Sequence, residues 1–159
     1  MIIELEIVEA RGLLASDRNG FSDPYVVVEK TPGLRAGAKT PIIKKTLDPV
    51  WNFKTVLHFT SDLEKLKFRV FDWDRFSSDD PLGSCSFSPS IFNDGVPIDT
   101  WEPLKQKPKK KKKLAPGEKK PVYPIKGELH IKMTAKNQCQ FCTPGNWFAV
   151  QAAAGAAGG

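Results

Sequence analysis

Four aspartates fall within nine residues of the sequence, in the stretch VFDWDRFSSDDPLG at residues 70–83. They are Asp72, Asp74, Asp79 and Asp80. Asp72 and Asp74 are two residues apart in an extended segment, so their side chains point the same way. Asp80 follows a loop that is long enough to fold back. Because close carboxylates repel one another and take up protons unless a cation compensates them, the stretch predicts a cation site.

A second pair of aspartates, Asp17 and Asp23, flanks the sequence RNGFS. Asn19-Gly20 favours a tight turn, which brings the flanking carboxylates back toward each other. Calcium accepts about six to eight oxygen ligands in flexible geometry, whereas magnesium requires a strict octahedron. Zinc prefers His and Cys, which neither loop contains. We therefore predict a calcium site formed by the carboxylates of Asp17, Asp23, Asp72, Asp74 and Asp80. Asp79 is expected to be a solvated neighbour without a role.

The elements that position these carboxylates are short strands, because apolar and polar residues alternate with a period of two along most of the chain. Glycine, proline and Asx clusters separate the strands at the spacing typical of a sandwich. One short helical turn is expected at residues 89–93. The sequence predicts an all-β fold, an eight-stranded antiparallel Greek-key β-sandwich, with strands at residues 2–9, 25–30, 39–46, 53–59, 66–72, 82–88, 100–104 and 127–135.

Strand direction predicts where the loops lie. Consecutive strands of an antiparallel sandwich run in opposite directions, so the connections that leave strands one, three, five and seven emerge at the same end. Three of these connections are acidic, namely SDRNGFSD, LDPVW and the stretch at residues 70–83. The fourth is a lysine-rich tract. All four are therefore predicted at one end of the molecule, with both termini at the other end.

The net charge of +6 is concentrated in one segment. Residues 105–120 contain nine lysines and one glutamate, a local charge of +8, so the rest of the 159-residue chain carries −2. A dedicated nucleic-acid binder would show a basic face on the folded body. We expect one β-sandwich domain at residues 1–136, with the lysine-rich loop 105–125 between its last two strands. A flexible tail of Cys, Ala and Gly is expected at residues 137–159.

No apolar run is long enough to span a membrane, and the N-terminal sequence MIIELEIVEA lacks the basic start and cleavage site of a signal peptide. Three cysteines are too few for a disulfide framework, which favours a reducing compartment. We therefore expect a cytoplasmic protein.

The stretches LEIVEARGLLASDRNGFSDPYVVV, KKTLDPVWN and LKFRVFDWDRFSSDDPLG together resemble the C2 domain, a calcium-dependent phospholipid-binding β-sandwich. The resemblance covers roughly residues 1–135. It implies that the five predicted aspartates bind two calcium ions together with the backbone carbonyls of Ser16 and Trp73, and that Ser77 contributes to a third ion. Because the chain starts at IELEIVEA and the sandwich ends with GELHIKMTA, it resembles the circularly permuted variant known as type II topology.

These features predict an electrostatic switch. Without calcium, five carboxylates are repelled by an anionic phospholipid surface, and bound calcium weakens or reverses that repulsion. Phe21 and Phe76 lie at the loop tips without an obvious role in the core, and each contributes roughly 1.5–3 kcal/mol if it is buried in lipid. Arg18 and Arg75 stand beside them and suit phosphate. The basic tract is expected to add a second membrane contact through Lys109, Lys110, Lys111, Lys112 and Lys113.

Three other classes of function remain open from the residues. A calcium-regulated or basic-tract protein-interaction module would recruit an acidic protein partner without touching lipid. A magnesium-dependent phosphoryl-transfer enzyme would also use aspartates, but the sequence has no phosphate-cradling glycine loop and no nucleophile–base pair, so we expect no enzymatic activity. Nucleic-acid binding through KPKKKKK would be strongly salt-dependent and lacks an aromatic platform, so we do not expect it.

Overall fold

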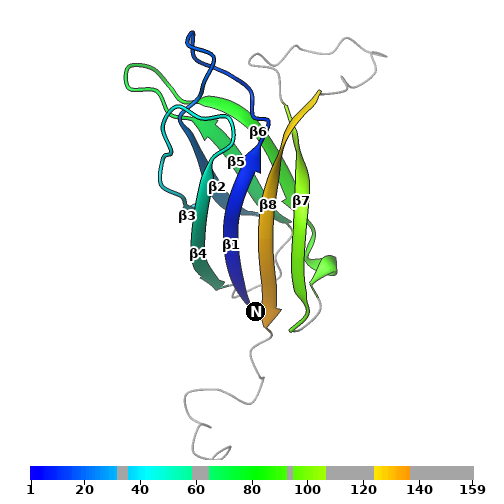
Figure 1. Cartoon of the computed structure of the whole chain (residues 1–159). Helices are drawn as coiled ribbons and strands as arrows, with labels where there is room; N and C mark the ends of the chain where they lie inside the picture. Colours follow the sequence, from blue (N-terminus) through cyan, green and yellow to red (C-terminus); the bar gives the residue numbers. More distant parts are fainter. Residues whose placement is uncertain (32–35, 59–64, 93–94, 107–123, 137–159) are drawn as a thin grey trace, which may run out of the picture.

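A computed structural model describes residues 1–31, 36–58, 65–92, 95–106 and 124–136 of the chain. Its strands pair antiparallel in one eight-stranded sheet with the order β3-β2-β5-β6-β7-β8-β1-β4, which confirms the predicted all-β antiparallel class (Figure 1). The predicted helical turn is the short 3₁₀ helix η1 (Pro89–Ile91). The strands are β1 (Ile2–Arg11), β2 (Pro24–Thr31), β3 (Ala36–Lys39), β4 (Val50–His58), β5 (Lys65–Asp72), β6 (Asp80–Phe87), β7 (Pro97–Lys105) and β8 (Ile125–Lys136).

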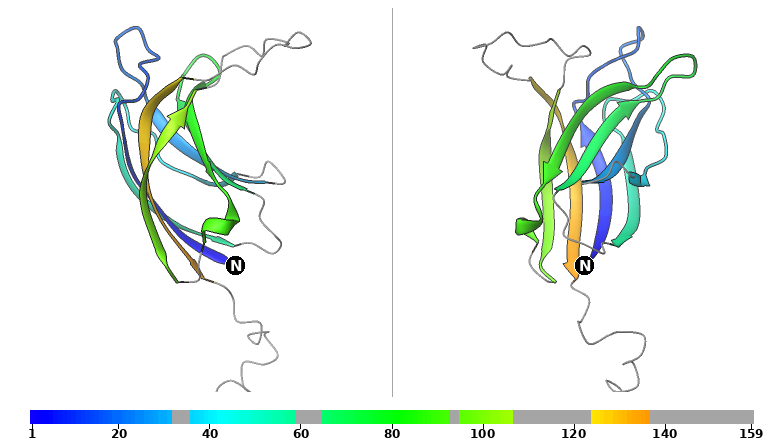
Figure 2. Two further views of the ribbon diagram at one scale, coloured as in Figure 1. Left: turned by 90° about the vertical axis from the view of Figure 1, so that its right-hand side faces the viewer. Right: turned by 180° about the vertical axis from the view of Figure 1, so that it is seen from behind.

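The sheet folds over itself into two facing layers (Figure 2). One layer contains β3, β2, β5 and β6, and the other contains β7, β8, β1 and β4. The layers are joined where Ser84 on β6 pairs with Lys105 on β7. A sandwich is the expected result, because each strand is apolar on one face and must bury that face against another layer.

The core lies between the two layers and follows the predicted alternation. On β1, Ile3, Leu5 and Ile7 are buried. A shift of register between Ile7 and Glu9 marks a β-bulge, after which Ala10 takes the buried position. The opposite layer supplies the buried side chains of Val26, Val28, Leu66, Phe68, Val70 and Leu82.

The third strand lies earlier in the sequence than predicted. The apolar centre of KTPIIKKT suggested a strand at residues 39–46, but β3 is Ala36–Lys39. Pro41 has no N–H to donate to a sheet, so regular pairing cannot continue through it. The chain instead makes separate hydrogen bonds to the start of β2, from Thr40 N–H to the Val26 carbonyl (3.0 Å) and from Ile43 N–H to the Pro24 carbonyl (3.1 Å).

Three loops gather at one end of the sandwich. We call them loop 1 (residues 12–23), loop 2 (residues 40–49) and loop 3 (residues 73–79), and they follow β1, β3 and β5. Figure 1 shows all three at the end opposite the N-terminus, which confirms the prediction from strand direction for these three of the four connections. Lys136, the last described residue, pairs with Ile2 and so lies at the end away from these loops. The basic tract Lys109–Lys113 and the tail after Lys136 lie outside the described residues.

Candidate metal site

Asp72 is the most deeply placed of the predicted ligands. It occupies the fourth inward position of β5, after Leu66, Phe68 and Val70, and is only 4% exposed. Asp23 N–H donates a hydrogen bond of 2.6 Å to Asp72 Oδ1. Burial raises the pKa of Asp72, and the negative charges of Asp17 and Asp23 raise it further, while bonds from Asp23 N–H and the Ser16 hydroxyl oppose the rise. The carboxylate therefore sits in a negative field that is only partly compensated.

Asp23 connects all three loops at their base. Its carboxylate Oδ1 accepts a 2.7 Å hydrogen bond from Lys45 N–H on loop 2, and its carbonyl accepts a 3.0 Å bond from Trp73 N–H on loop 3. Lys45 has a left-handed φ of 56°, an uncommon conformation for a residue with a side chain. This strained peptide directs its N–H at the Asp23 carboxylate, so loop 2 shares in holding the acidic centre.

Asp80 and Ser16 join loop 1 to the first residue of β6. The Ser16 hydroxyl donates to Asp80 Oδ2 at 3.0 Å, and Ser16 N–H donates to Ser22 Oγ at 3.1 Å. Ser22 is fully buried and donates its hydroxyl to the Leu14 carbonyl at 2.8 Å. Hydrogen bonds through Ser16 and Ser22 therefore hold the base of loop 1 together and connect it to the Asp80 carboxylate.

Asp74 stands at the exposed part of loop 3 and binds the loop itself. Its Oδ1 accepts a 2.9 Å bond from Phe76 N–H, and its Oδ2 accepts a 2.5 Å bond from the Ser77 hydroxyl. These two bonds hold the pKa of Asp74 below its usual value. The carboxylate stays ionised, and both oxygens already have partners in the loop.

Asp17 lies in the predicted tight turn. Gly20 N–H donates to the Asp17 carbonyl, and Asp17 N–H donates to the Phe21 carbonyl, each at 3.1 Å. Gly20 has φ 82°, which glycine adopts without strain. The turn brings Asp17 close enough to Asp72 for its charge to act on the Asp72 carboxyl.

The five aspartates therefore meet at one end, but their side chains do not yet surround a common point. Within the described part of the chain, no group of three His, Cys, Asp or Glu side chains is arranged to hold a metal ion as the side chains stand. Four of the carboxylates accept hydrogen bonds from loop N–H or hydroxyl groups instead. The donor set is all oxygen and carries unbalanced negative charge, so it fits a hard cation such as calcium rather than zinc.

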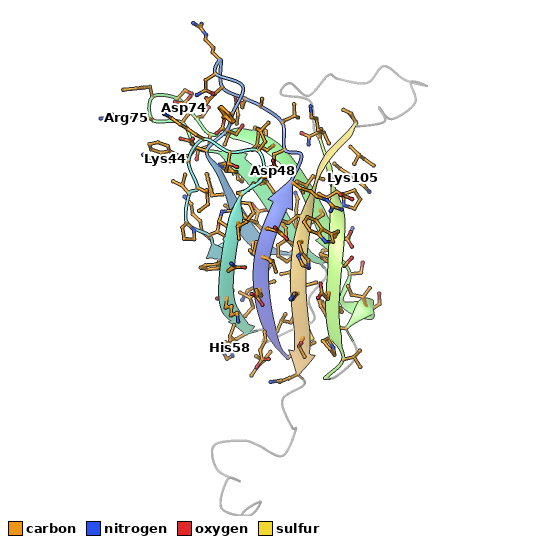
Figure 3. All side chains as sticks on the ribbon, in the orientation of Figure 1. Lys44, Asp48, His58, Asp74, Arg75 and Lys105 are labelled. Atoms are coloured by element: carbon orange, nitrogen blue, oxygen red, sulfur yellow. The ribbon has the colours of Figure 1, made fainter. Side chains whose placement is uncertain are left out.

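The predicted membrane-contact residues are at the same end. Phe76 is 91% exposed and Phe21 is 45% exposed, so neither is part of the core. Arg75 places its guanidinium 5.4 Å from the centre of the Phe76 ring, and Lys44 places its ammonium 5.7 Å from the Trp73 ring. Figure 3 shows Asp74, Arg75 and Lys44 together at the loop end and His58 at the opposite end. Arg18 in loop 1 is exposed.

The expectation for Asp79 is wrong. Its Oδ2 accepts a hydrogen bond from the Tyr25 hydroxyl, and its Oδ1 accepts a 3.0 Å bond from Asp74 N–H. Tyr25 lies 54 residues earlier in the chain, so local spacing gave no indication of the pair. Lys45 N–H and the buried Ser22 were also missed, because backbone donors and loop hydroxyls leave no pattern in a sequence.

Comparison with known proteins identifies a family whose model matches most of the chain. Residues 1–104 match the family model of the C2 domain. The chain is 40% identical over 103 residues to the eye isozyme of protein kinase C from Drosophila melanogaster, covering 62% of this chain and 15% of the kinase. The match therefore spans only a small part of that protein.

Solved structures share the fold. A C2 domain of plant extended synaptotagmin 1 superposes with a TM-score of 0.69 at 20% identity, covering 87% of this chain and 96% of that one. A calcium-bound pair of C2 domains from extended synaptotagmin 2 gives a TM-score of 0.57 at 22% identity, covering 84% of this chain and 44% of that one. At these identities the likeness shows the fold alone.

Proposed function

The chain belongs to the C2 domain family, and on this basis we propose that it is a calcium-dependent peripheral membrane-binding module. Loops 1, 2 and 3 would dock on anionic phospholipid of the phosphatidylserine type. The observation that supports this most directly is the meeting of five aspartates and two exposed phenylalanines at one end of the sandwich. Acidic ligands and apolar tips on the same loops suit a site that binds a cation and a lipid surface together.

Calcium would be held by the carboxylates of Asp17, Asp23, Asp72, Asp74 and Asp80 with the carbonyls of Ser16 and Trp73, and Ser77 would assist a third ion. Loops 1 to 3 with Asp72 and Asp80 contain seven aspartates and four basic side chains, a net charge of −3. Bound calcium supplies positive charge and open coordination positions for headgroup oxygens. Two ions would change the local charge to +1, so repulsion from an anionic surface would become attraction.

Phe76 and Phe21 would enter the lipid once that repulsion is removed. Burying one such side chain contributes roughly 1.5–3 kcal/mol. Arg75 and Arg18 stand next to them and would bind lipid phosphate, since a guanidinium offers a fork of donors. The basic tract Lys109–Lys113 would add a salt-sensitive contact of at most ~1 kcal/mol per lysine.

Three finer points are part of the same proposal. The sandwich would have the type II strand connectivity, which is supported by loop 1 directly following the first strand and by the start of β1 and the end of β8 lying away from the loops. The protein acts by binding rather than by catalysis. It would be cytoplasmic and would move to a membrane surface when calcium rises. None of the helices among the described residues is long and apolar enough to cross a bilayer.

Sedimentation with phosphatidylserine-containing vesicles tests the proposal. The full chain is titrated with calcium against chelator beside the variant Asp72→Asn/Asp74→Asn. A matched control is Glu4→Gln/Asp99→Asn, which removes the same charge from β1 and β7, outside the three loops. We expect calcium-dependent pelleting of the parent chain and the control, and its loss in the loop variant.

Two results would contradict the proposal of calcium-dependent membrane binding in different ways. Equal pelleting in chelator would mean that the basic tract, rather than the aspartate end, binds the vesicle. No pelleting at any calcium concentration would favour the alternative, a calcium-regulated or basic-tract module that recruits an acidic protein.

A further inference from the structure

We propose that Tyr25 and Asp79 form a positioning pair that holds loop 3 in the conformation needed to bind calcium. This inference rests on the proposed calcium function and adds a residue pair to it. Tyr25 is on β2 and Asp79 is the last residue of loop 3, so their hydrogen bond connects the rigid sheet to the loop. Neither residue belongs to the predicted ligand set.

Tyr25 is a fixed anchor because its ring is held on several sides. The residue is 5% exposed although it points away from the core. Its ring stacks on Phe71 of β5, with centroids 5.6 Å apart and planes at 23°. Lys39 Nζ lies 4.1 Å from the centre of the Tyr25 ring.

Phe71 is itself held in place by further contacts. The Arg69 guanidinium lies 4.5 Å from the centre of the Phe71 ring, and Arg69 makes a 2.9 Å ion pair with Glu29 of β2. The outer face of β2, β3 and β5 is therefore packed around the Tyr25 ring. Its hydroxyl is held at one place relative to the sheet.

Asp79 transmits that fixed position to loop 3. One carboxylate oxygen accepts the Tyr25 hydroxyl and the other accepts Asp74 N–H at 3.0 Å. Both oxygens are therefore engaged within the protein, one by the sheet and the other by loop 3. The bond to Asp74 N–H fixes the peptide of a predicted ligand, and Phe76 and Ser77 then bind the Asp74 carboxylate from the other side.

The physical benefit is preorganisation. Ordering a flexible loop when a ligand binds costs conformational entropy and lowers affinity. Loop 3 is exposed through residues 74–78 and has few core contacts of its own, so the bond from Tyr25 replaces missing packing. The expected consequence is tighter calcium binding at an unchanged number of ligands.

The test is calcium binding by the full chain, measured by isothermal titration calorimetry, with Tyr25→Phe as the main variant. This change removes one hydroxyl and keeps the ring stack. We expect the calcium affinity to fall about three- to tenfold, the effect of one hydrogen bond. Thr31→Val is the matched control, because it removes a hydroxyl that donates to the Lys65 carbonyl at the other end of the same strand. Its calcium affinity should equal that of the parent chain.

Two variants of Asp79 separate positioning from charge. Asn can still accept Asp74 N–H and pair with the Tyr25 hydroxyl, whereas Ala can do neither. We expect Asp79→Ala to weaken calcium binding about tenfold. Asp79→Asn should retain most of the calcium affinity of the parent chain. Combining Tyr25→Phe with Asp79→Ala should add little to Asp79→Ala alone, because both remove the same contact.

Hydrogen exchange without calcium gives a second, independent readout. The amide of Asp74 should exchange faster in Tyr25→Phe than in the parent chain. In Thr31→Val, the exchange rates of the loop 3 amides should equal those of the parent chain. An unchanged calcium affinity in Tyr25→Phe, or an Asp79→Asn loss equal to that of Asp79→Ala, would overturn the positioning role. If the parent chain bound no calcium, the proposed function would fail, and unchanged exchange at Asp74 would then overturn the loop-holding role as well.

Discussion

Replacing Asp72 by Asn should stabilise the protein without calcium and remove its stabilisation by calcium. Asn has nearly the same shape, and its Oδ1 can still accept the 2.6 Å bond from Asp23 N–H. The change removes a charge from a side chain that is 4% exposed and faces the charges of Asp17 and Asp23. The calcium-free variant should therefore melt at a higher temperature than the parent chain at pH 7.

The pH dependence follows from the direction of the pKa shift. Because folding raises the pKa of Asp72, the protonated carboxyl favours the folded state. That contribution is fully present below the unfolded pKa of about 3.9 and is lost as the pH rises through the folded pKa. The stability gain of Asp72→Asn should therefore be absent at low pH and appear as the pH rises toward neutrality.

Calcium should reverse the order of the two melting temperatures, so that the parent chain melts above Asp72→Asn. A ligand that binds only the folded state at 100 times its dissociation constant adds about 2.7 kcal/mol. For a chain of 159 residues this corresponds to a melting temperature increase of roughly 5–11 °C. The parent chain should gain this amount and Asp72→Asn little of it, because the variant lacks the most deeply placed of the proposed ligands.

Scanning calorimetry of both proteins in chelator and in calcium measures all four states. Glu4→Gln serves as the control, since it neutralises an exposed carboxylate on β1 and should leave the response to calcium unchanged. If Asp72→Asn were less stable than the parent chain in chelator, the interpretation of Asp72 as a partly compensated buried charge would be refuted. An equal rise in the melting temperature of both proteins in calcium would remove Asp72 from the proposed ligand set.

Three further changes test separate parts of the structure. Phe76→Ala should leave the melting temperature and calcium affinity unchanged, because the side chain is 91% exposed, but should weaken calcium-dependent vesicle binding by roughly 10- to 100-fold. Gly83→Ala should lower the free energy of unfolding by about 1–3 kcal/mol in a urea titration, because φ is 145° and the new Cβ would lie 2.8 Å from Leu104 Cβ. Cys85 should resist iodoacetamide in the folded protein and react in guanidinium, as judged by peptide mass mapping, since it is 8% exposed and burial with the nearby Glu102 charge raises its pKa to about 12.

Most of the fold could be predicted because its determinants are local. The alternation of Ile3, Leu5 and Ile7 with glutamates defines β1 without reference to any distant residue. The exception is β3, where Pro41 stands inside an apolar run. Apolar content favoured a strand there, but a missing N–H outweighs it, and the chain leaves the sheet after Lys39.

The placement of the aspartates at one end of the sandwich could be predicted, but the contacts that their carboxylates make could not. Strand direction and the spacing of Asp72, Asp74 and Asp80 were enough to predict that the aspartates lie at one end. The partner of each carboxylate depends on how the loops meet, as when Lys45 N–H from loop 2 reaches Asp23. Asp79 differs from Asp80 by one position, yet its partner is Tyr25 on the outer face of β2, a contact between residues far apart in sequence.

The core and the acidic end are set by the same strand register. Leu66, Phe68 and Val70 are buried at every second position of β5, and Asp72 is the next residue in that series. A slip of one residue would turn the three apolar side chains toward solvent and move Asp72 to the outer face. The energy that buries the core therefore also holds a carboxylate where its neighbours are acidic. For this reason the unfavourable charge at Asp72 persists in the folded state, and a cation at the loop end is the natural compensation.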